Sequence, residues 1–203
     1  MILGIIDYQA GNITSLYYAV RYWGEYVKIL RNARECMDCD RIIFPGVGEA
    51  KSVMMVLAQL HFDEALQRFV EAQRPLLGVC IGAHVVLSSS EEGNTACLNL
   101  VPGQVRLLPV KKGAKVPHMG WNNLSRPSDS FLFSSVPEEA AMYFAHSYYP
   151  EVTDKVNILS YTEHSVLFPS SYVFESVVGV QFHPEKSGMY GLYVIRNFLY
   201  WSP

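Results

Sequence analysis

The chain has few of the features that mark membrane, nucleic-acid-binding or secreted proteins. None of its apolar stretches approaches the roughly 20 residues that a membrane-spanning helix needs. Net charge is −3 and no basic run is longer than Lys111-Lys112, so we expect no nucleic-acid partner and no membrane partner. The segment Met1–Asp7 has no basic flank and turns acidic after six residues, which is typical of a buried strand and not of a signal peptide.

Cysteine is also scarce, at four residues in the whole chain. Few cysteines without an export signal indicate free thiols in a reducing compartment, so we predict a cytoplasmic protein. Cys36 and Cys39 form a C-x-x-C pair. A zinc site would need a second ligand pair at short spacing, and the sequence has none. We therefore interpret this pair as a chance spacing and expect no metal site.

The sequence does contain ample apolar material, at 50% of 203 residues, which is enough for the core of one domain spanning residues 1–203. In the first half, short apolar runs alternate with helical patterns. This order predicts βαβ units and a mostly parallel sheet. We expect strands at 2–7, 26–30, 41–44 and 75–79, and helices at 12–23 (with Asn12 as N-cap), 49–60 and 62–73.

The second half changes character and is rich in β-forming residues joined by turns that contain proline and glycine. The pattern predicts a basic loop at 111–117 and a closing amphipathic helix at 188–201. We expect β structure at 101–108, 141–149, 156–161 and 172–182.

A candidate nucleophile lies where the strand at 75–79 meets a predicted helix, in the run Gly78-Val79-Cys80-Ile81-Gly82. A glycine two residues to either side of a nucleophile is the pattern of a nucleophile elbow, because the turn leaves no room for side chains there. The helix that follows directs its positive dipole end at the sulfur and favours thiolate, the reactive form of cysteine.

A candidate base and its orienting carboxylate lie about 100 residues further on. His183 and Glu185 are two residues apart, so on an extended segment both side chains would project to one face. A cysteine at its ordinary pKa of about 8.5 is mostly protonated at neutral pH and needs such a base. We predict that Cys80, His183 and Glu185 act as nucleophile, general base and orienter.

A third element is the run Phe44-Pro45-Gly46-Val47-Gly48, also at the end of a predicted strand. Its two glycines, Gly46 and Gly48, allow main-chain N–H groups to turn toward a neighbouring loop. These groups, together with the N–H of Ile81, are candidates to stabilise an oxyanion.

These three runs resemble the class I (triad) glutamine amidotransferases. Four further runs resemble, more narrowly, the glutaminase subunit of imidazole glycerol phosphate synthase: 7–12 (Asp-Tyr-Gln-Ala-Gly-Asn), 117–122 (Pro-His-Met-Gly-Trp-Asn), 146–149 (His-Ser-Tyr-Tyr) and 179–187 (Gly-Val-Gln-Phe-His-Pro-Glu-Lys-Ser). The resemblance extends from residue 2 to the C-terminal helix. It implies a single-domain, three-layer α/β fold with a mostly parallel central sheet.

The resemblance also implies an activity and a partner. Cys80 would attack the side-chain amide of glutamine and His183 would protonate the leaving ammonia. The ammonia would pass to a (β/α)₈ cyclase subunit in a heterodimer, which makes imidazole glycerol phosphate and aminoimidazole carboxamide ribotide in histidine biosynthesis. The family implies no metal and no organic cofactor, and it suggests substrate contacts near Ser147 and Tyr148. We interpret His118 and His146 as packing or interface groups.

The chain departs from the family at the elbow, where Cys-Leu-Gly-Met-Gln is replaced by Cys80-Ile81-Gly82-Ala83-His84. The family's glutamine helps to hold the substrate, and an imidazole cannot present a donor and an acceptor side by side on one terminal group as an amide does. We therefore expect His84 to alter glutamine binding. Two alternatives stay open: a paralogous glutaminase that supplies another synthase, such as a surface-sugar amidotransferase, and a scaffold without activity.

Overall fold

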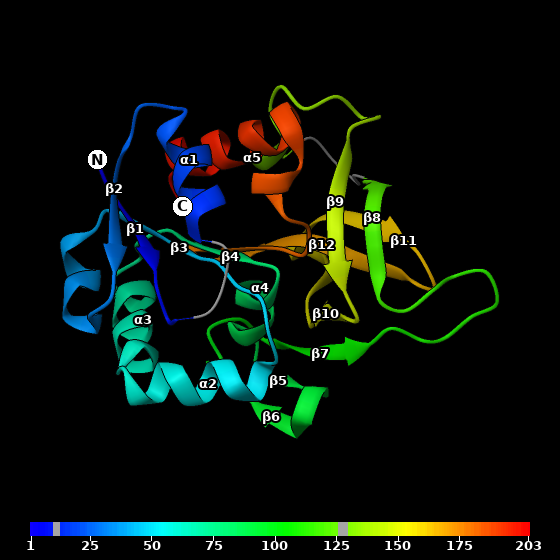
Figure 1. The fold of residues 1–203 in the computed structure, drawn as a ribbon, viewed down its shortest axis with the longest axis horizontal. Coiled ribbons are helices and arrows are strands. Elements are labelled where there is room, and N and C mark those ends of the chain that lie inside the picture. The colour runs from blue at the N-terminus through cyan, green and yellow to red at the C-terminus, as the bar shows by residue number, and fades with distance from the viewer. Residues whose placement is uncertain (10–12, 126–129) are drawn as a thin grey trace.

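The computed structural model describes residues 1–9, 13–125 and 130–203, which fold around a seven-stranded sheet (Figure 1). The strand order is β11-β12-β13-β4-β3-β1-β2. The neighbours from β13 to β2 are parallel, whereas β11 and β12 at one edge run antiparallel to their neighbours. The bounds of these strands are β1 (Ile2–Ile6), β2 (Tyr26–Leu30), β3 (Arg41–Phe44), β4 (Leu76–Val79), β11 (Ile158–Glu163), β12 (Leu167–Phe174) and β13 (Val177–Val180).

Helices cover both faces of this sheet, so the predicted three-layer α/β fold is confirmed (Figure 1). Helices α1 (Ile13–Arg21) and α5 (Gly188–Tyr200) pack together on one face. The other face carries α2 (Ala50–Gln59), α3 (Phe62–Glu71) and the short α4 (Ile81–Val85).

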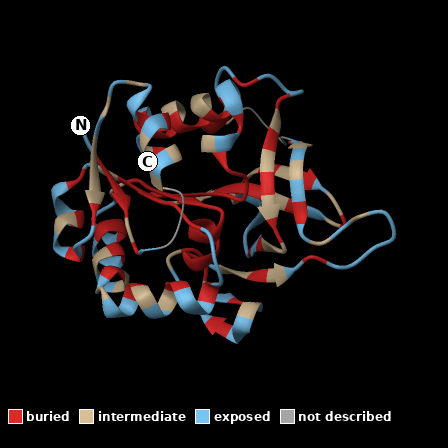
Figure 2. Cartoon of the chain, viewed as in Figure 1, coloured by how far each residue is buried: buried red, intermediate tan, exposed pale blue. Residues whose placement is uncertain are grey.

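Each face of the sheet has its own apolar core, because successive side chains of a strand point in opposite directions. In β1, Leu3 and Ile5 pack beneath α1 and α5, whereas Ile6 packs with α2 and α3. Figure 2 shows the result: the sheet is buried throughout its centre and exposed residues lie on the outer sides of the helices. Among the described residues, no helix is long and apolar enough to span a bilayer.

The first half follows the sequence prediction closely. Strands β2 and β3 have the predicted bounds, and β1, β4, α2 and α3 differ from theirs by one or two residues at an end. Helix α1 begins at Ile13, and the predicted N-cap Asn12 lies outside the described residues. These elements are local patterns of burial, which sequence periodicity reports well.

In the second half of the chain, two of the predicted β regions each contain a break between strands. The predicted β structure at 141–149 contains two strands, β9 (Ala141–His146) and β10 (Tyr148–Val152), because the chain changes sheets at Ser147. The predicted β structure at 172–182 belongs to the hairpin of β12 and β13, which turns at Glu175 with a positive φ of 49°. Both turns lack the glycine or asparagine that usually marks a break.

Two smaller sheets flank the main one. Strands β10, β7, β5 and β6 form a four-stranded sheet, and β9 pairs antiparallel with β8. Of these, β5, β6 and β8 were not predicted from the sequence. Their bounds are β5 (Ser89–Ser90), β6 (Thr95–Ala96), β7 (Gly103–Leu107) and β8 (His118–Asn123). The basic segment 111–117 is the loop between β7 and β8, as predicted.

The topology brings the predicted functional runs together. Strands β13, β4 and β3 are adjacent and parallel, so their carboxyl ends meet at one edge of the sheet. His183 follows β13, Cys80 follows β4 and the glycine-containing run follows β3. In open α/β sheets this edge is where ligand sites form.

Candidate active site

Cys80 lies in a strained turn between β4 and α4. Its backbone has φ 53° and ψ −108°, which non-glycine residues rarely adopt. The surrounding backbone holds this conformation, because the Cys80 N–H donates to the Val180 carbonyl at 2.8 Å and the Cys80 carbonyl accepts from the His84 N–H at 3.2 Å. Such strain places a side chain at the mouth of a pocket, as the predicted nucleophile elbow requires.

The two glycines of the elbow, Gly78 and Gly82, are required because neighbouring backbone atoms leave no room for a side chain at either position. A Cβ on Gly78 would lie 2.7 Å from the carbonyl oxygen of Gly82, and a Cβ on Gly82 would lie 2.1 Å from the carbonyl oxygen of Phe44. Both contacts are to backbone atoms, which cannot rotate away. The elbow therefore packs directly against the end of β3.

His183 and Glu185 form the predicted pair, although by a different backbone geometry. The His183 Nδ1 and Glu185 Oε1 atoms lie 2.9 Å apart, and both side chains are almost fully buried. The segment is not extended as predicted, because Pro184–Lys186 forms a 3₁₀ turn after β13 ends at Val180. The turn folds the carboxylate back onto the imidazole.

The pKa of His183 reflects these neighbours. Burial lowers it, but the hydrogen bonds with the Cys80 and Glu185 side chains raise it more, and the net shift is upward to about 10. The imidazole is therefore protonated at neutral pH while Cys80 is its partner. An imidazolium beside a sulfur is the charge arrangement that favours thiolate.

Ser187, for which the sequence predicted no role, links this segment to the neighbouring strand β9. Its Oγ donates to the His183 carbonyl at 2.6 Å and accepts from the Tyr143 N–H at 3.0 Å. The His183 N–H in turn donates to the Tyr143 carbonyl at 2.8 Å. The histidine is thus tied to β9 from both of its backbone groups.

The glycine-containing loop after β3 lies against the elbow. Val47 and Gly48 line the pocket that Cys80 faces, and Gly48 has a φ of 115°. The Val47 carbonyl accepts from the Tyr8 hydroxyl at 3.3 Å. Gly46 was predicted as part of the oxyanion loop, but it does not line the pocket. It is buried beneath Ile81, where a Cβ would lie 1.9 Å from the isoleucine side chain. Its role is close packing.

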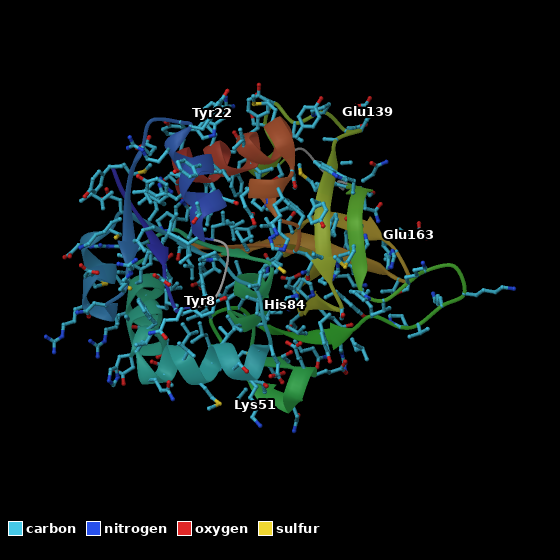
Figure 3. All side chains as sticks on the ribbon, in the orientation of Figure 1. Tyr8, Tyr22, Lys51, His84, Glu139 and Glu163 are labelled. Atoms are coloured by element: carbon cyan, nitrogen blue, oxygen red, sulfur yellow. The ribbon has the colours of Figure 1, made fainter. Side chains whose placement is uncertain are left out.

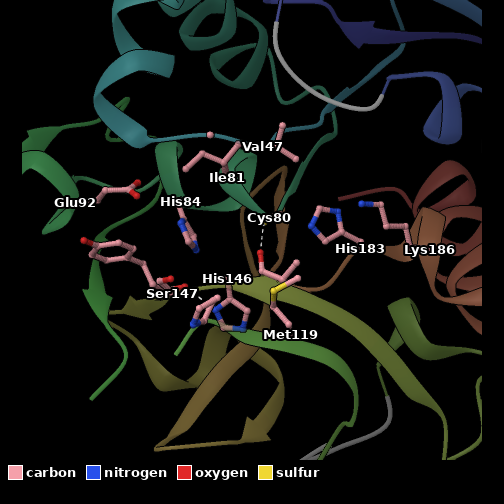
Figure 4. A pocket seen from close by; sticks show the side chains of 14 residues that line it. Val47, Cys80, Ile81, His84, Glu92, Met119, His146, Ser147, His183 and Lys186 are labelled. Carbon is pink, nitrogen blue, oxygen red and sulfur yellow. Dashed lines mark hydrogen bonds between the residues drawn. The ribbon is translucent and has the colours of Figure 1, made fainter. Parts of the chain in front are cut away.

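A pocket of about 340 Å³ lies between the elbow, the loop after β3 and His183 (Figure 4). Besides Val47 and Gly48, the predicted residues that line it are Cys80, Ile81, His84, Ser147, Tyr148 and His183. Glu185 does not line it, since it lies behind the histidine. Four residues that were not predicted as site residues also line the pocket: Glu92, Met119, His146 and Lys186.

Glu92 is, among the described residues, the only carboxylate that lines this pocket. Its Oε2 accepts from the Ala50 N–H at 2.8 Å, which fixes the carboxylate at the start of α2. Burial raises the pKa of Glu92, and the hydrogen bond from Ala50 opposes this shift. No sequence signal marks Glu92, because a charged residue between short strands resembles an ordinary surface loop.

His84, on the short helix α4 near the centre of the view in Figure 3, is buried although its ring also lines the pocket. Its Nε2 lies 2.6 Å from Oε1 of Gln181, a buried side chain. Burial lowers the pKa of His84 to about 4, so the ring is neutral at physiological pH. His84 therefore has a protein partner as well as a place in the pocket wall, and its expected effect on glutamine binding stays a prediction.

His118 and His146 form a buried pair behind the Ser147 wall, with 2.9 Å between Nδ1 of His118 and Nε2 of His146. The His118 ring stacks against Phe144 and His164. His118 thus has the predicted packing role, whereas His146 also lines the pocket. Within the described part of the chain, no group of three or more His, Cys, Asp or Glu side chains is arranged to hold a metal ion.

Comparisons with known proteins agree with this geometry. The family model for class-I glutamine amidotransferase matches residues 4–201. The chain is 39% identical to imidazole glycerol phosphate synthase subunit HisH of Chloroflexus aurantiacus over 98% of this chain and 96% of that protein. It is 41% identical to the HisH subunit of Methanosarcina acetivorans over 96% of each.

Solved structures give the same fold. The Thermotoga maritima PurLQS structure matches with a TM-score of 0.75 at 19% identity, over 98% of this chain and 97% of that one. At this identity the likeness concerns the fold alone. The family match and the full-length identity to the HisH proteins establish more: this chain is an enzyme of the class-I glutamine amidotransferase family, and within it belongs with the HisH subunits of imidazole glycerol phosphate synthase.

Proposed function

We propose that the chain hydrolyses glutamine to glutamate and ammonia, and that it supplies the ammonia to a (β/α)₈ cyclase subunit that makes imidazole glycerol phosphate. The observation that carries this proposal is the meeting of Cys80, His183 and Glu185 at the carboxyl ends of β4 and β13, with the cysteine facing a pocket. The four free thiols of the chain fit the cytoplasm, the compartment expected from its sequence.

In the first half-reaction, the Cys80 thiolate attacks the side-chain amide carbon of glutamine. The oxygen takes up negative charge, which main-chain N–H groups would stabilise. Ile81 is the first residue of α4, so its N–H has no intrahelical acceptor. We assign it as one oxyanion donor, and a Val47 or Gly48 N–H as the second. The C–N bond then breaks as the His183 imidazolium protonates the nitrogen, which leaves as ammonia.

The second half-reaction returns the enzyme to its starting state. His183, now neutral, takes a proton from water, and the resulting hydroxide attacks the glutamyl thioester. The C–S bond breaks, glutamate leaves and the Cys80 thiolate is restored beside the imidazolium. Glu185 lies behind the ring, where its carboxylate accepts from Nδ1–H and stabilises the positive charge.

The pocket also has the groups needed to hold the amino-acid end of glutamine. The substrate carries an α-ammonium, and Glu92 offers a fixed carboxylate at the pocket wall. The α-carboxylate requires N–H donors, which the main chain at Ser147 and Tyr148 can offer where β9 passes into β10. This assignment places the two charged ends of the substrate opposite the nucleophile.

We place the cyclase subunit on the face next to the pocket mouth. Met119 and Trp121 are two residues apart on β8, so they share a face, and they are 65% and 59% exposed. Met119 also lines the pocket, so this apolar face is continuous with the site at which ammonia forms. A partner that covers it would receive ammonia without loss to solvent.

The test is to combine the purified chain with the cyclase subunit of the same organism and measure both products. We expect glutamine-dependent formation of glutamate and of imidazole glycerol phosphate, and loss of both in Cys80→Ser. Ammonium salts should still support the cyclase reaction with Cys80→Ser. A wild-type complex that makes product from ammonium salts but not from glutamine would contradict the proposal.

The alternative partner, a synthase outside histidine biosynthesis, is not favoured, because the full-length relatives are HisH subunits. Growth of a histidine auxotroph that lacks its own glutaminase subunit separates the two. We expect the chain, together with its cyclase subunit, to restore growth without histidine.

A further inference from the structure

The buried amide of Gln181 lies between the nucleophile and His84. Its Nε2 is 3.8 Å from the Cys80 sulfur and its Oε1 is 2.6 Å from Nε2 of His84. Gln181 is fully buried and His84 almost so. Both polar ends of the amide thus have a partner, and each partner lies on the elbow.

The chemistry of the two contacts determines which atom donates. A carbonyl oxygen can only accept, so the proton between Gln181 and His84 must sit on Nε2 of His84. A thiolate can also only accept, so the amide nitrogen must face the sulfur. An amide rotated by 180° would direct its oxygen at the thiolate, and the two would repel.

We propose that Gln181 is a catalytic residue that donates an N–H to the Cys80 thiolate, and that His84 is the positioning residue that keeps the amide in this orientation. The inference rests on the proposed glutaminase reaction but adds a residue to its machinery. A fixed donor at the sulfur stabilises the charged nucleophile before substrate arrives.

Burial supports the assignment. Because burial lowers the pKa of His84 to about 4, the ring is neutral at physiological pH. It therefore presents one donor and one acceptor rather than two donors. With Nε2 protonated, Nδ1 is left as an acceptor on a ring that lines the pocket. His84 therefore serves the nucleophile through Gln181, which an apolar residue of similar size could not do.

The sharpest test uses two amides in place of the imidazole. The nitrogen of glutamine occupies roughly the place of Nε2 of histidine, whereas that of asparagine occupies the place of Nδ1. We expect His84→Gln to keep the donor to Gln181 and His84→Asn to lose it. The readout is the rate at which iodoacetamide alkylates Cys80 at pH 7, followed by mass spectrometry of the Cys80 peptide in the full chain.

We expect the alkylation rate to fall about tenfold in His84→Asn and to stay within about twofold of wild type in His84→Gln, because a hydrogen bond to a charged group is lost only in the first. In the complex with the cyclase subunit, kcat of glutaminase should fall in parallel in His84→Asn and be retained in His84→Gln. Equal alkylation rates in the two variants would overturn the role of His84.

Gln181→Met tests the donor itself with a side chain of similar size. We expect the same loss of alkylation rate, with near-UV circular dichroism and the urea midpoint used to verify the fold. If Gln181→Met does not fold, the His84 pair still decides the role of His84. For the donor, Gln181→Glu replaces Nε2 by an oxygen and should slow alkylation at least as strongly. An unchanged rate in a folded Gln181 variant would overturn the proposal.

This test is independent of the proposed function, because iodoacetamide needs neither glutamine nor a partner. Rapid, Gln181-dependent alkylation in a chain without glutaminase activity would contradict the proposed function alone. Full glutaminase activity with an alkylation rate insensitive to Gln181 and His84 would contradict this inference alone.

Discussion

Nδ1 of His118 donates to Nε2 of His146 across 2.9 Å, and the hydrogen bonds on either side of this contact determine both tautomers. The Tyr148 carbonyl accepts from Nδ1 of His146 at 2.7 Å, so Nε2 of His146 must be an acceptor. Nε2 of His118 is then free to accept from the Asn122 side-chain amide at 3.2 Å. The chain of bonds is complete only while both rings are neutral, because a protonated ring would direct two N–H groups at each other.

Acid should therefore destabilise the fold through this pair. Burial lowers the pKa of His118 to about 4 and that of His146 well below the usual value of 6.5. The unfolded chain binds these protons first, so the stabilising effect is complete above pH 6.5 and is lost as pH falls toward 4. We expect the free energy of unfolding, measured with urea, to decrease by about 3 kcal/mol for His118 over this range.

The control for this prediction is a matched substitution. His118→Asn keeps a donor near the place of Nδ1 but cannot titrate, so its stability should depend less steeply on pH between 6.5 and 4. His61→Asn, at an exposed position with a left-handed φ of 59° that asparagine tolerates, should keep the wild-type dependence. Parallel curves for His118→Asn and wild type would refute the prediction.

Gly82→Ala should destabilise the chain strongly, because the new methyl group would lie 2.1 Å from the Phe44 carbonyl oxygen. We expect a loss of about 3 kcal/mol in urea unfolding and slower alkylation of Cys80, since strand β3 and the elbow must move apart. Gly113→Ala is the control: its φ of 91° is also positive, but its Cβ would meet no atom within 4 Å. This variant should lose only about 1 kcal/mol. Equal losses in the two variants would show that the clash is unimportant.

Glu185→Gln should lower the pKa of His183. The substitution keeps an oxygen for the Nδ1–H but removes the negative charge that, with Cys80, raises this pKa to about 10. We expect the His183 Cε1–H resonance to titrate at least one pH unit lower than in wild type, with kcat reduced roughly 10- to 100-fold. The stabilisation from His183 is present below pH 6.5 and is lost as pH rises toward 10, so this loss should be smaller and should end at lower pH in the variant. An unshifted resonance would rule out Glu185 as the charge partner.

Trp121→Ala should weaken binding of the cyclase subunit without changing Cys80. Exposed tryptophans at the centre of an interface often account for about 2 kcal/mol, or roughly thirtyfold in Kd by calorimetry. Tyr26→Ala, an equally exposed aromatic on β2 at the far edge of the main sheet, is the control and should bind as wild type does. If the two variants bound the cyclase subunit equally well, with a normal alkylation rate of Cys80 in both, the apolar face of Met119 and Trp121 would not be the binding site of that subunit.

The first half of the fold was predictable because its elements are local. Strands β2 and β3 were predicted with their observed bounds. Burial on both faces leaves β3 a continuous apolar run, whereas β2, at the edge of the sheet, is only partly buried but is rich in β-forming residues. The second half was less predictable. The chain changes sheets at Ser147 without a turn residue, and only the pairing of β9 with β8 and of β10 with β7 reveals the break.

The candidate site divides in the same way. The sequence alone determined the elbow around Cys80 and the pairing of His183 with Glu185, because glycine spacing and a two-residue interval are properties of a short segment. It could not determine that His84 meets Gln181, 97 positions away, or that Glu92 lines the pocket. Such contacts depend on which strands become neighbours, and that is decided only when the whole sheet assembles and buries its two cores.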